Sequence, residues 1–253
     1  MIKLSVITIN YNNAAGLQKT IQSVISQTFK DYEYIVIDGG SNDGSKEIIE
    51  SYAGKITYWV SEKDTGIYNA MNKGIQQAKG AYCLFLNSGD FLCNHKVLEE
   101  AFALNNTADI IYGNMMIDWG NGKRTEGKMP DSITALQMYV DTLWHPVSFI
   151  KRELFYKYGL YNEAYKMVAD YDFFFKTIIA NKVSTKHIPL LVSEYNVDGF
   201  SSKPESKAIE KEERKRVIHS YLSQEEINYL EGIAQKEKQK KDNSIKSFLK
   251  KWF

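Results

Sequence analysis

The stretch Tyr82-Cys-Leu-Phe-Leu-Asn-Ser-Gly-Asp-Phe91 decides the predicted fold, because an apolar run ends in it abruptly at a polar cluster. A continuous apolar run of this length is typical of a central strand that is covered on both faces. Asn87, Ser88 and Asp90 follow at the carboxyl end of that strand. Since the ligand crevice of an open α/β sheet lies outside the carboxyl ends of its strands, the cluster indicates a ligand site.

Strands and helices alternate through the first half of the chain. β-Branched and apolar runs predict the strands, and apolar residues at helical spacing predict the helices between them. The expected strands are residues 4–9, 32–37, 56–60, 82–86 and 109–112, and the expected helices are residues 17–27, 67–78 and 96–104 with a further one around 48–49. This order predicts an α/β fold with a mostly parallel, Rossmann-like central sheet and flanking helices.

The regular alternation ends after residue 112. Asn121-Gly122 lies between two strand-like segments and predicts a β-hairpin at a mixed edge of the sheet. Further helices are expected at residues 133–139, 152–158 and 173–179, and extended segments at residues 144–150 and 187–196. Residues 197–204 have the composition of a mobile loop.

The bulk composition is that of an ordinary soluble globular protein. The chain has 253 residues and a net charge of +1, so no overall field favours nucleic acid as a partner. Cys83 and Cys93 are too few for a disulfide framework or a zinc cluster, which favours a reducing, cytoplasmic location. The amino terminus has no secretory signal pattern, and no apolar run is long enough to cross a bilayer.

Residues 204–253 are richer in lysine, glutamate and arginine, on helical patterns with narrow apolar seams. We expect a C-terminal helical extension on the outside of a domain formed by residues 1–203. The last stretch, Lys236 to Phe253, combines lysines with five apolar residues at near-helical spacing: Ile245, Phe248, Leu249, Trp252 and Phe253. Such a basic amphipathic helix can lie on a membrane surface, bind a partner, or remain a solvated tail.

Four polar groups fall at predicted ends of strands or starts of helices: Asn10–Asn12, Asp38 with its glycine-rich loop, Asn87–Asp90, and Asp170 with Asp172. Taken singly, each group is also compatible with an ordinary turn or a helix cap. Their shared placement predicts one site. Asp64-Thr65-Gly66 precedes a further helix, which contains Asn72, and would aim the amino end of that helix at the same ligand.

These segments resemble glycosyltransferase family 2, which has the GT-A fold, over roughly residues 4–201. The resemblance rests on five motifs: Ser5-Val-Ile-Thr-Ile-Asn-Tyr-Asn12, Ile37-Asp-Gly-Gly-Ser-Asn-Asp-Gly-Ser45, Gly66-Ile-Tyr-Asn-Ala-Met-Asn-Lys-Gly74, Phe85-Leu-Asn-Ser-Gly-Asp90 and Ala169-Asp-Tyr-Asp172. Residues 61–74 look like the bacterial branch that builds surface polysaccharides. The resemblance implies a nucleotide-sugar half at about residues 1–113 and an acceptor half at about residues 114–203.

The resemblance also implies roles for single residues. Thr8 and Asp38 fall where the family holds the nucleoside, and Asp90 falls where it binds Mn²⁺ or Mg²⁺ on the diphosphate. Hard oxygen ligands suit both ions. Asp170 matches the catalytic base, which takes the proton of the attacking acceptor hydroxyl in a single displacement with inversion. The other residues expected to bind substrate are Asn10, Asp64, Asn72, Asn87, Ser88, His145 and Asp172.

Two of these positions carry an open question. His145 is equally compatible with a structural hydrogen bond. Asp90 is the sole clear carboxylate ligand for a metal, because Asn87 and Gly89 stand where members of the family often have carboxylates.

The expected function is that of an inverting, metal-dependent glycosyltransferase. Its donor would be a nucleotide-diphosphate sugar, expected to be UDP-linked, and its acceptor a hydroxyl of a growing bacterial surface glycan, lipopolysaccharide or capsule, which a lipid can carry. One alternative is a sugar-nucleotide nucleotidyltransferase, although residues 10–16 offer no arginine or lysine to meet a triphosphate. Another is a noncatalytic glycan-binding module that has kept the fold. The expected location is the cytoplasm, at the inner face of the cell membrane if the tail binds lipid.

Overall fold

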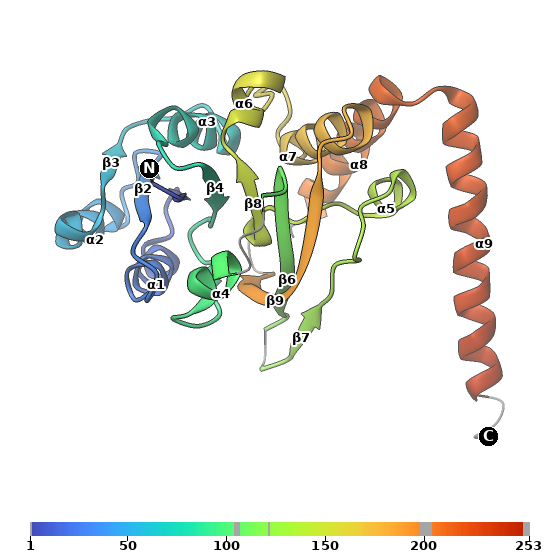
Figure 1. The fold of residues 1–253 in the computed structure, drawn as a ribbon, viewed down its shortest axis with the longest axis horizontal. Coiled ribbons are helices and arrows are strands. Elements are labelled where there is room, and N and C mark those ends of the chain that lie inside the picture. Colours follow the sequence, from blue (N-terminus) through green and yellow to red (C-terminus); the bar gives the residue numbers. More distant parts are fainter. Residues whose placement is uncertain (1, 104–106, 121, 198–203, 250–253) are drawn as a thin grey trace.

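A mixed β-sheet forms the centre of the molecule, with helices against both of its faces (Figure 1). The structure is a computed structural model that describes residues 2–103, 107–120, 122–197 and 204–249, with the backbone alone for residues 204–205 and 241–249. Within these ranges the sheet has nine strands in the order β3-β2-β1-β4-β8-β6-β9-β5, and β7 pairs with β6.

The first four strands in this order are parallel: β3 (Tyr58–Ser61), β2 (Tyr32–Asp38), β1 (Leu4–Asn10) and β4 (Tyr82–Phe85). Their carboxyl ends therefore meet at one edge of the sheet. Because side chains alternate along a strand, β1 sends Val6 into the core on one face and Ile7 into the core on the other. The first face is covered by α1 (Ala14–Ile25), α2 (Ser45–Ser51) and α4 (Val97–Ala103), and the second by α3 (Ile67–Gln77).

The second half of the sheet joins the first through β8 (Ser148–Lys151), which runs antiparallel to both β4 and β6 (Ile110–Asp118). The ladder between β4 and β8 pairs Tyr82 with Lys151 and Cys83 with Ile150. The remaining elements of this half are β5 (Phe91–Leu92), β7 (Arg124–Gly127), β9 (Thr185–Asn196), α5 (Ala135–Val140), α6 (Glu153–Tyr158), α7 (Ala169–Phe174) and the π-helix η3 (Phe175–Ala180).

Two long helices follow. α8 (Pro204–Tyr221) packs on α7 and η3 and buries Val217 completely in the core. α9 (Gln224–Leu249) buries Ile227 and Leu230 near its start, and Figure 1 shows the rest of it standing away from the body. The predicted C-terminal helices are confirmed: α8 packs on the outside of the domain, with Val217 as its fully buried apolar contact and most of its other described residues exposed or partly exposed. The division into residues 1–203 and 204–253 stays a prediction. No helix within the described residues is long and apolar enough to cross a membrane.

Most of the other predicted elements are confirmed, including the antiparallel pair β6 and β7. Asn121 itself and residues 198–203 of the predicted loop lie outside the described residues. The extended segment expected at residues 144–150 is partly wrong. His145–Val147 form the short 3₁₀ helix η2 before β8 begins, because the fixed φ of Pro146 suits the first turn of a helix. No periodic pattern announces β5 or the 3₁₀ turn η1 (Ala53–Lys55), since each has too few residues.

Gly74 lets α3 approach β1 closely. A Cβ atom at Gly74 would lie 2.4 Å from Cγ2 of Ile7, a fully buried side chain that is stiff at χ1. Gly232 is also helical, but a Cβ atom there would meet nothing within 4 Å. The two glycines therefore form a matched pair for testing this contact.

We expect Gly74→Ala to lower the free energy of unfolding by about 1 to 3 kcal/mol, because it overpacks the core. Gly232→Ala should raise the same quantity by roughly 0.5 to 1 kcal/mol, because alanine favours a helix more than glycine does. Urea unfolding followed by circular dichroism measures both values. Equal effects of the two substitutions would contradict the close packing of α3 on β1.

Candidate active site

Asp38 is the centre of a hydrogen-bonded group at the carboxyl ends of β1, β2 and β3. Its Oδ1 accepts from Nδ2 of Asn10 at 2.7 Å, and its Oδ2 accepts from the Ser61 hydroxyl at 2.6 Å and from the backbone N–H of Ser41 at 3.0 Å. Burial acts to raise the pKa of Asp38, but the hydrogen bonds outweigh burial and lower it. Asn10, Asp38, Ser41 and Ser61, here called the Asp38 cluster, thus hold an ionised carboxylate at neutral pH.

Asp64 and Tyr11 frame the Asp38 cluster. Both approach Gly39: a Cβ atom there would lie 2.5 Å from Oδ2 of Asp64 and 3.3 Å from Cδ2 of Tyr11. Oδ1 of Asp64 accepts from the backbone N–H of Gly66 at 3.1 Å, just before α3. The structure therefore brings Asp64 beside the Asp38 cluster, and its substrate contact stays a prediction. Tyr11 belongs to the predicted Asn10–Asn12 group but has no predicted role; its side chain is 66% exposed, so its ring can stack against a planar ligand.

Tyr68, Asn87, His145 and Asp170 form a continuous hydrogen-bonded group, here called the relay cluster. The Tyr68 hydroxyl donates to Oδ1 of Asp170 at 2.9 Å. Nδ1 of His145 lies 3.1 Å from Oδ2 of Asp170, and Nε2 of His145 lies 3.2 Å from Nδ2 of Asn87. Because Nδ1 faces a carboxylate and Nε2 faces an amide nitrogen, these partners assign the ring proton to Nδ1. The predicted residues Asn87, His145 and Asp170 thus lie together. Tyr68 joins them, although the sequence pattern does not predict a role for it.

Asp170 lies in the first turn of α7 and is largely buried. Burial acts to raise its pKa, but the hydrogen bonds from His145 and Tyr68, with the backbone N–H of Tyr171, lower the pKa below its usual value. Oδ1 accepts the bonds from Tyr68 and Tyr171, whereas Oδ2 accepts only the one from His145. Since a carboxylate oxygen has two lone pairs, Oδ2 can still accept a proton.

Asp90 is buried beside the relay cluster, just beyond β4. Burial raises the pKa of Asp90 to about 7, although His145 and the backbone amide of Asn87 both lower it. Oδ1 of Asn87 is also buried and has no hydrogen-bond partner among the described residues. A carboxylate and an amide oxygen are hard donors of the kind that Mg²⁺ and Mn²⁺ take, and a cation would offset the buried charge. These residues fit a divalent ion.

The set of metal ligands from the protein is small. Within the described residues, no group of three or more histidine, cysteine, aspartate or glutamate side chains could hold a metal ion. Asp90 would therefore be a single carboxylate ligand, and substrate oxygens and water would have to complete the coordination.

Ser88 ties the loop after β4 to β1 and α1. Its backbone N–H donates to the carbonyl of Ile9 at 3.0 Å, and its own carbonyl accepts from Nδ2 of Asn13 at 2.8 Å. The hydroxyl of Thr20, from α1, donates to the carbonyl of Asp90 at 2.7 Å. These bonds hold the Asp90 backbone beside the Asp38 cluster, so Ser88 is placed at the site by its main chain.

Asp172, by contrast, does not face the site. Residues two apart in a helix are separated by about 200° around its axis, so Asp170 and Asp172 point to opposite sides of α7. Oδ1 of Asp172 accepts from the Tyr221 hydroxyl on α8 at 2.9 Å, and its Oδ2 lies 3.8 Å from Nζ of Lys176. The structure thus places Asp172 in a buried contact between helices, apart from the relay cluster, and its substrate contact stays a prediction.

Thr8 and Asn72 are also held inside the protein. Thr8 is fully buried, and its hydroxyl lies 3.0 Å from that of Tyr34. Nδ2 of Asn72 donates to the Tyr161 carbonyl at 2.9 Å and to Oε1 of Glu163 at 2.8 Å, while its Oδ1 accepts from the Tyr161 N–H at 3.0 Å. The structure thus places neither side chain in the Asp38 cluster or the relay cluster, and the substrate contacts of both residues stay predictions. Alternation along β1 puts Thr8 in the core, and Asn72 fastens α3 to the segment before α7.

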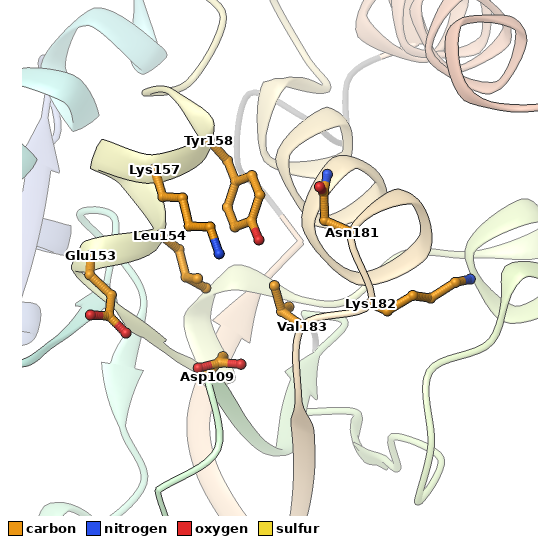
Figure 2. A pocket seen from close by; sticks show the side chains of 8 residues that line it. All are labelled: Asp109, Glu153, Leu154, Lys157, Tyr158, Asn181, Lys182 and Val183. Carbon is orange, nitrogen blue, oxygen red and sulfur yellow. The ribbon is translucent and has the colours of Figure 1, made fainter.

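A cavity of about 380 Å³ lies elsewhere, at the amino end of β6 (Figure 2). Its lining comes from α6, from the residues before β6 and from the turn after η3: Asp109, Glu153, Leu154, Lys157, Tyr158, Asn181, Lys182 and Val183. β6 runs in the same direction as β4, because both are antiparallel to β8. The cavity is therefore at the opposite edge of the sheet from the Asp38 and relay clusters.

The sequence matches a model of the family described as Glycosyl transferase family 2 over residues 5–173. An uncharacterized glycosyltransferase of Mycobacterium tuberculosis (strain ATCC 25618 / H37Rv) is 32% identical over 210 residues, which cover 81% of this chain and 79% of that protein. The PGL/p-HBAD biosynthesis glycosyltransferase of Mycobacterium bovis (strain BCG / Pasteur 1173P2) is 29% identical over 201 residues, 77% of each chain.

Solved structures share the fold. S. aureus TarS 1–349 in complex with UDP superposes with a TM-score of 0.66 at 24% identity, over 85% of this chain and 64% of that one. The mannosyltransferase PcManGT of Pyrobaculum calidifontis, in complex with GDP-Man and Mn²⁺, gives a TM-score of 0.59 at 15% identity, over 76% of this chain and 56% of that one. The chain thus spans less than two thirds of these solved chains. The predicted GT-A type of fold is confirmed.

We expect Mn²⁺ to raise the melting temperature of the protein, because an ion that binds only the folded state stabilises it, by about 2.7 kcal/mol at 100 times its Kd. Asp90→Asn should abolish this rise, since it removes the carboxylate ligand. Differential scanning fluorimetry with and without Mn²⁺ measures both. Asp172→Asn is the matched control, because it changes a buried carboxylate that faces α8, and it should keep the rise. A full rise in the Asp90→Asn variant would contradict the role given to Asp90.

Proposed function

The chain belongs to glycosyl transferase family 2, and we propose that it transfers a sugar from a nucleotide-diphosphate sugar to a hydroxyl of a growing bacterial surface glycan. The observation that carries the proposal is Asp170, an ionised carboxylate whose Oδ2 keeps a free lone pair at the carboxyl edge of the sheet. A hydroxyl group attacks well only if its proton is removed as the new bond forms, and this needs such a base.

The Asp38 cluster is the proposed site for the nucleoside of the donor. Its ionised carboxylate can accept hydrogen bonds from a base, the exposed Tyr11 ring beside Gly39 can stack on it, and Oδ1 of Asn10 is buried without a partner among the described residues. S. aureus TarS has been solved with UDP-GlcNAc, and the Pyrobaculum calidifontis mannosyltransferase with GDP-Man. These complexes support a nucleotide sugar as donor, and we favour a UDP sugar.

The relay cluster is the proposed centre of the reaction. The acceptor oxygen forms a bond to the anomeric carbon while its proton passes to Oδ2 of Asp170, and the bond from that carbon to the diphosphate breaks with its electron pair. Attack from the side opposite the leaving group inverts the anomeric carbon. His145 and Tyr68 orient the carboxylate through its two oxygens. A divalent ion bound at Asp90 would neutralise charge on the departing diphosphate.

The family match favours sugar transfer over the nucleotidyltransferase alternative. The proposed acceptor class rests on the sequence of residues 61–74, which resembles that of the family branch that builds bacterial surface polysaccharides. A substitution of Asp170 distinguishes an enzyme from a noncatalytic module, because glycan binding by such a module would not require a catalytic base.

We expect Asp170→Asn to lower kcat by about 10²- to 10⁴-fold, the usual contribution of a general base, because an amide cannot take the proton. The Kd for UDP should stay unchanged, since Asp170 lies outside the Asp38 cluster. UDP release from a panel of UDP sugars and isothermal titration with UDP measure the two quantities. Asp172→Asn should keep most of the turnover, because asparagine still accepts the hydrogen bond from Tyr221. Normal turnover in the Asp170→Asn variant would refute the base assignment.

We also propose that the C-terminal tail contacts an anionic membrane surface. The support comes from the sequence, where seven lysines of the tail accompany its five apolar residues: Lys236, Lys238, Lys240, Lys241, Lys246, Lys250 and Lys251. In Figure 1 most of α9 stands away from the body, so a membrane could reach it without displacing the core. A basic amphipathic helix binds through apolar contact together with attraction to anionic lipid.

Deleting residues 236–253 should reduce sedimentation with vesicles that contain anionic lipid, and added salt should weaken binding of the full chain, because the attraction is partly electrostatic. Vesicles of neutral lipid serve as the control. Binding that neither the deletion nor salt alters would contradict the proposed membrane contact.

A further inference from the structure

α8 holds the chain on both sides of Asp170. Before Asp170, the carboxylate of Glu213 accepts the backbone N–H groups of Lys166 at 2.9 Å and of Met167 at 2.9 Å. After Asp170, the Tyr221 hydroxyl donates to Asp172 at 2.9 Å. Asp170 itself points away from α8, toward His145 and Tyr68. α8 thus contacts the segment around Asp170 on the side opposite to the proposed base.

Arg214 adds a third contact. Its guanidinium carbon lies 4.1 Å from the ring centroid of Tyr171, the residue next to Asp170, and its Nη2 donates to the Asp141 carbonyl at 2.8 Å. A cation is favoured there because Asp141 follows the carboxyl end of α5. α8 therefore fixes α7 against α5 as well as against the loop before α7.

Glu213 is an unusual residue for a contact that only fills space. The residue is 2% exposed, and its closest cation, the Arg216 guanidinium, is 3.9 Å away, too far for a hydrogen bond. Burying a carboxylate is unfavourable unless hydrogen bonds replace its hydration, and an apolar side chain would pack at lower cost. Unlike an apolar side chain, the carboxylate makes directional hydrogen bonds. These bonds fix the orientation of two successive backbone N–H groups in the loop just before α7.

We infer that Glu213 is a positioning residue that sets the placement of the Asp170 carboxylate through the loop that enters α7. This rests on the proposed function, in which Asp170 is the base. α7 has six residues, so a shift of the loop moves Asp170 directly relative to the donor. A displacement of about 1 Å can lower turnover by 10²-fold, because the reacting atoms must be aligned.

The test compares Glu213→Gln, Glu213→Ala and Glu212→Gln in the full chain. Glu212 is its exposed neighbour on α8, so Glu212→Gln makes the same chemical change without touching the loop. We expect kcat for UDP release from the best UDP sugar to fall about tenfold in Glu213→Gln and about 10²-fold in Glu213→Ala, with an unchanged Kd for UDP. Glutamine should rescue part of the loss because it keeps one acceptor oxygen, and Glu212→Gln should behave as wild type.

Hydrogen exchange separates positioning from general stability. In Glu213→Ala we expect faster exchange at the amides of residues 161–173, with unchanged exchange in β1, β2 and β4. Unchanged kcat in Glu213→Ala would overturn the inference. So would a loss of UDP affinity with faster exchange throughout the sheet, because Glu213 would then only stabilise the fold. A wild-type chain that releases no UDP from any UDP sugar would refute the proposed function instead, and exchange at residues 161–173 would still decide whether Glu213 holds the loop.

Discussion

Buried carboxylates impose the main constraint on this structure, because each must replace the water that it loses on burial. Asp38 receives an amide donor from the end of β1 and a hydroxyl donor from the end of β3, and Asp170 receives an imidazole and a phenol. Glu213 receives two backbone N–H groups. Each carboxylate receives donors from residues more than 20 positions away in the sequence, so satisfying a carboxylate also fixes how the elements meet. The arrangement of the site is a consequence of these requirements.

Asp90 is the carboxylate with the poorest compensation. Burial raises its pKa to about 7, whereas hydrogen bonds keep the pKa values of Asp38 and Asp170 below their usual range. The difference lies in the donors around each group rather than in burial alone. A cation would supply at Asp90 what side-chain donors supply at the other two. The ion that the proposed function places at Asp90 would therefore offset this buried charge.

The parallel half of the sheet could be predicted from the sequence, because its strands are continuous apolar runs that end in polar turns. The predicted positions of Asp38, Asn87 and Asp90 followed from the same rule about strand ends, and that of Asp170 from its place at the start of a helix. Thr8 could not be placed by that rule, because the core or surface position of a strand residue depends on which face its neighbours cover. Asp172 illustrates a second limit: its motif places it beside Asp170, but helical geometry turns it by about 200°. A third limit is that some contacts join residues 46 to 102 positions apart, which no local sequence pattern can predict. Examples are the contacts of Asn72 with Tyr161, Tyr68 with Asp170 and Glu213 with Met167.

The short ladder between β4 and β8 gives the sheet an uneven stiffness. β1 and β2 are paired along their whole length, from Leu4 with Tyr32 to Asn10 with Asp38, whereas β4 and β8 share two residue pairs. Bending the molecule would concentrate its strain at this ladder, since few hydrogen bonds resist it there. Asn87 follows one of these strands and His145 precedes the other, so the relay cluster spans the two halves of the sheet beside this two-pair ladder. A shift at the ladder would change the separation between the Asp38 cluster and Asp170 while leaving each half of the sheet intact.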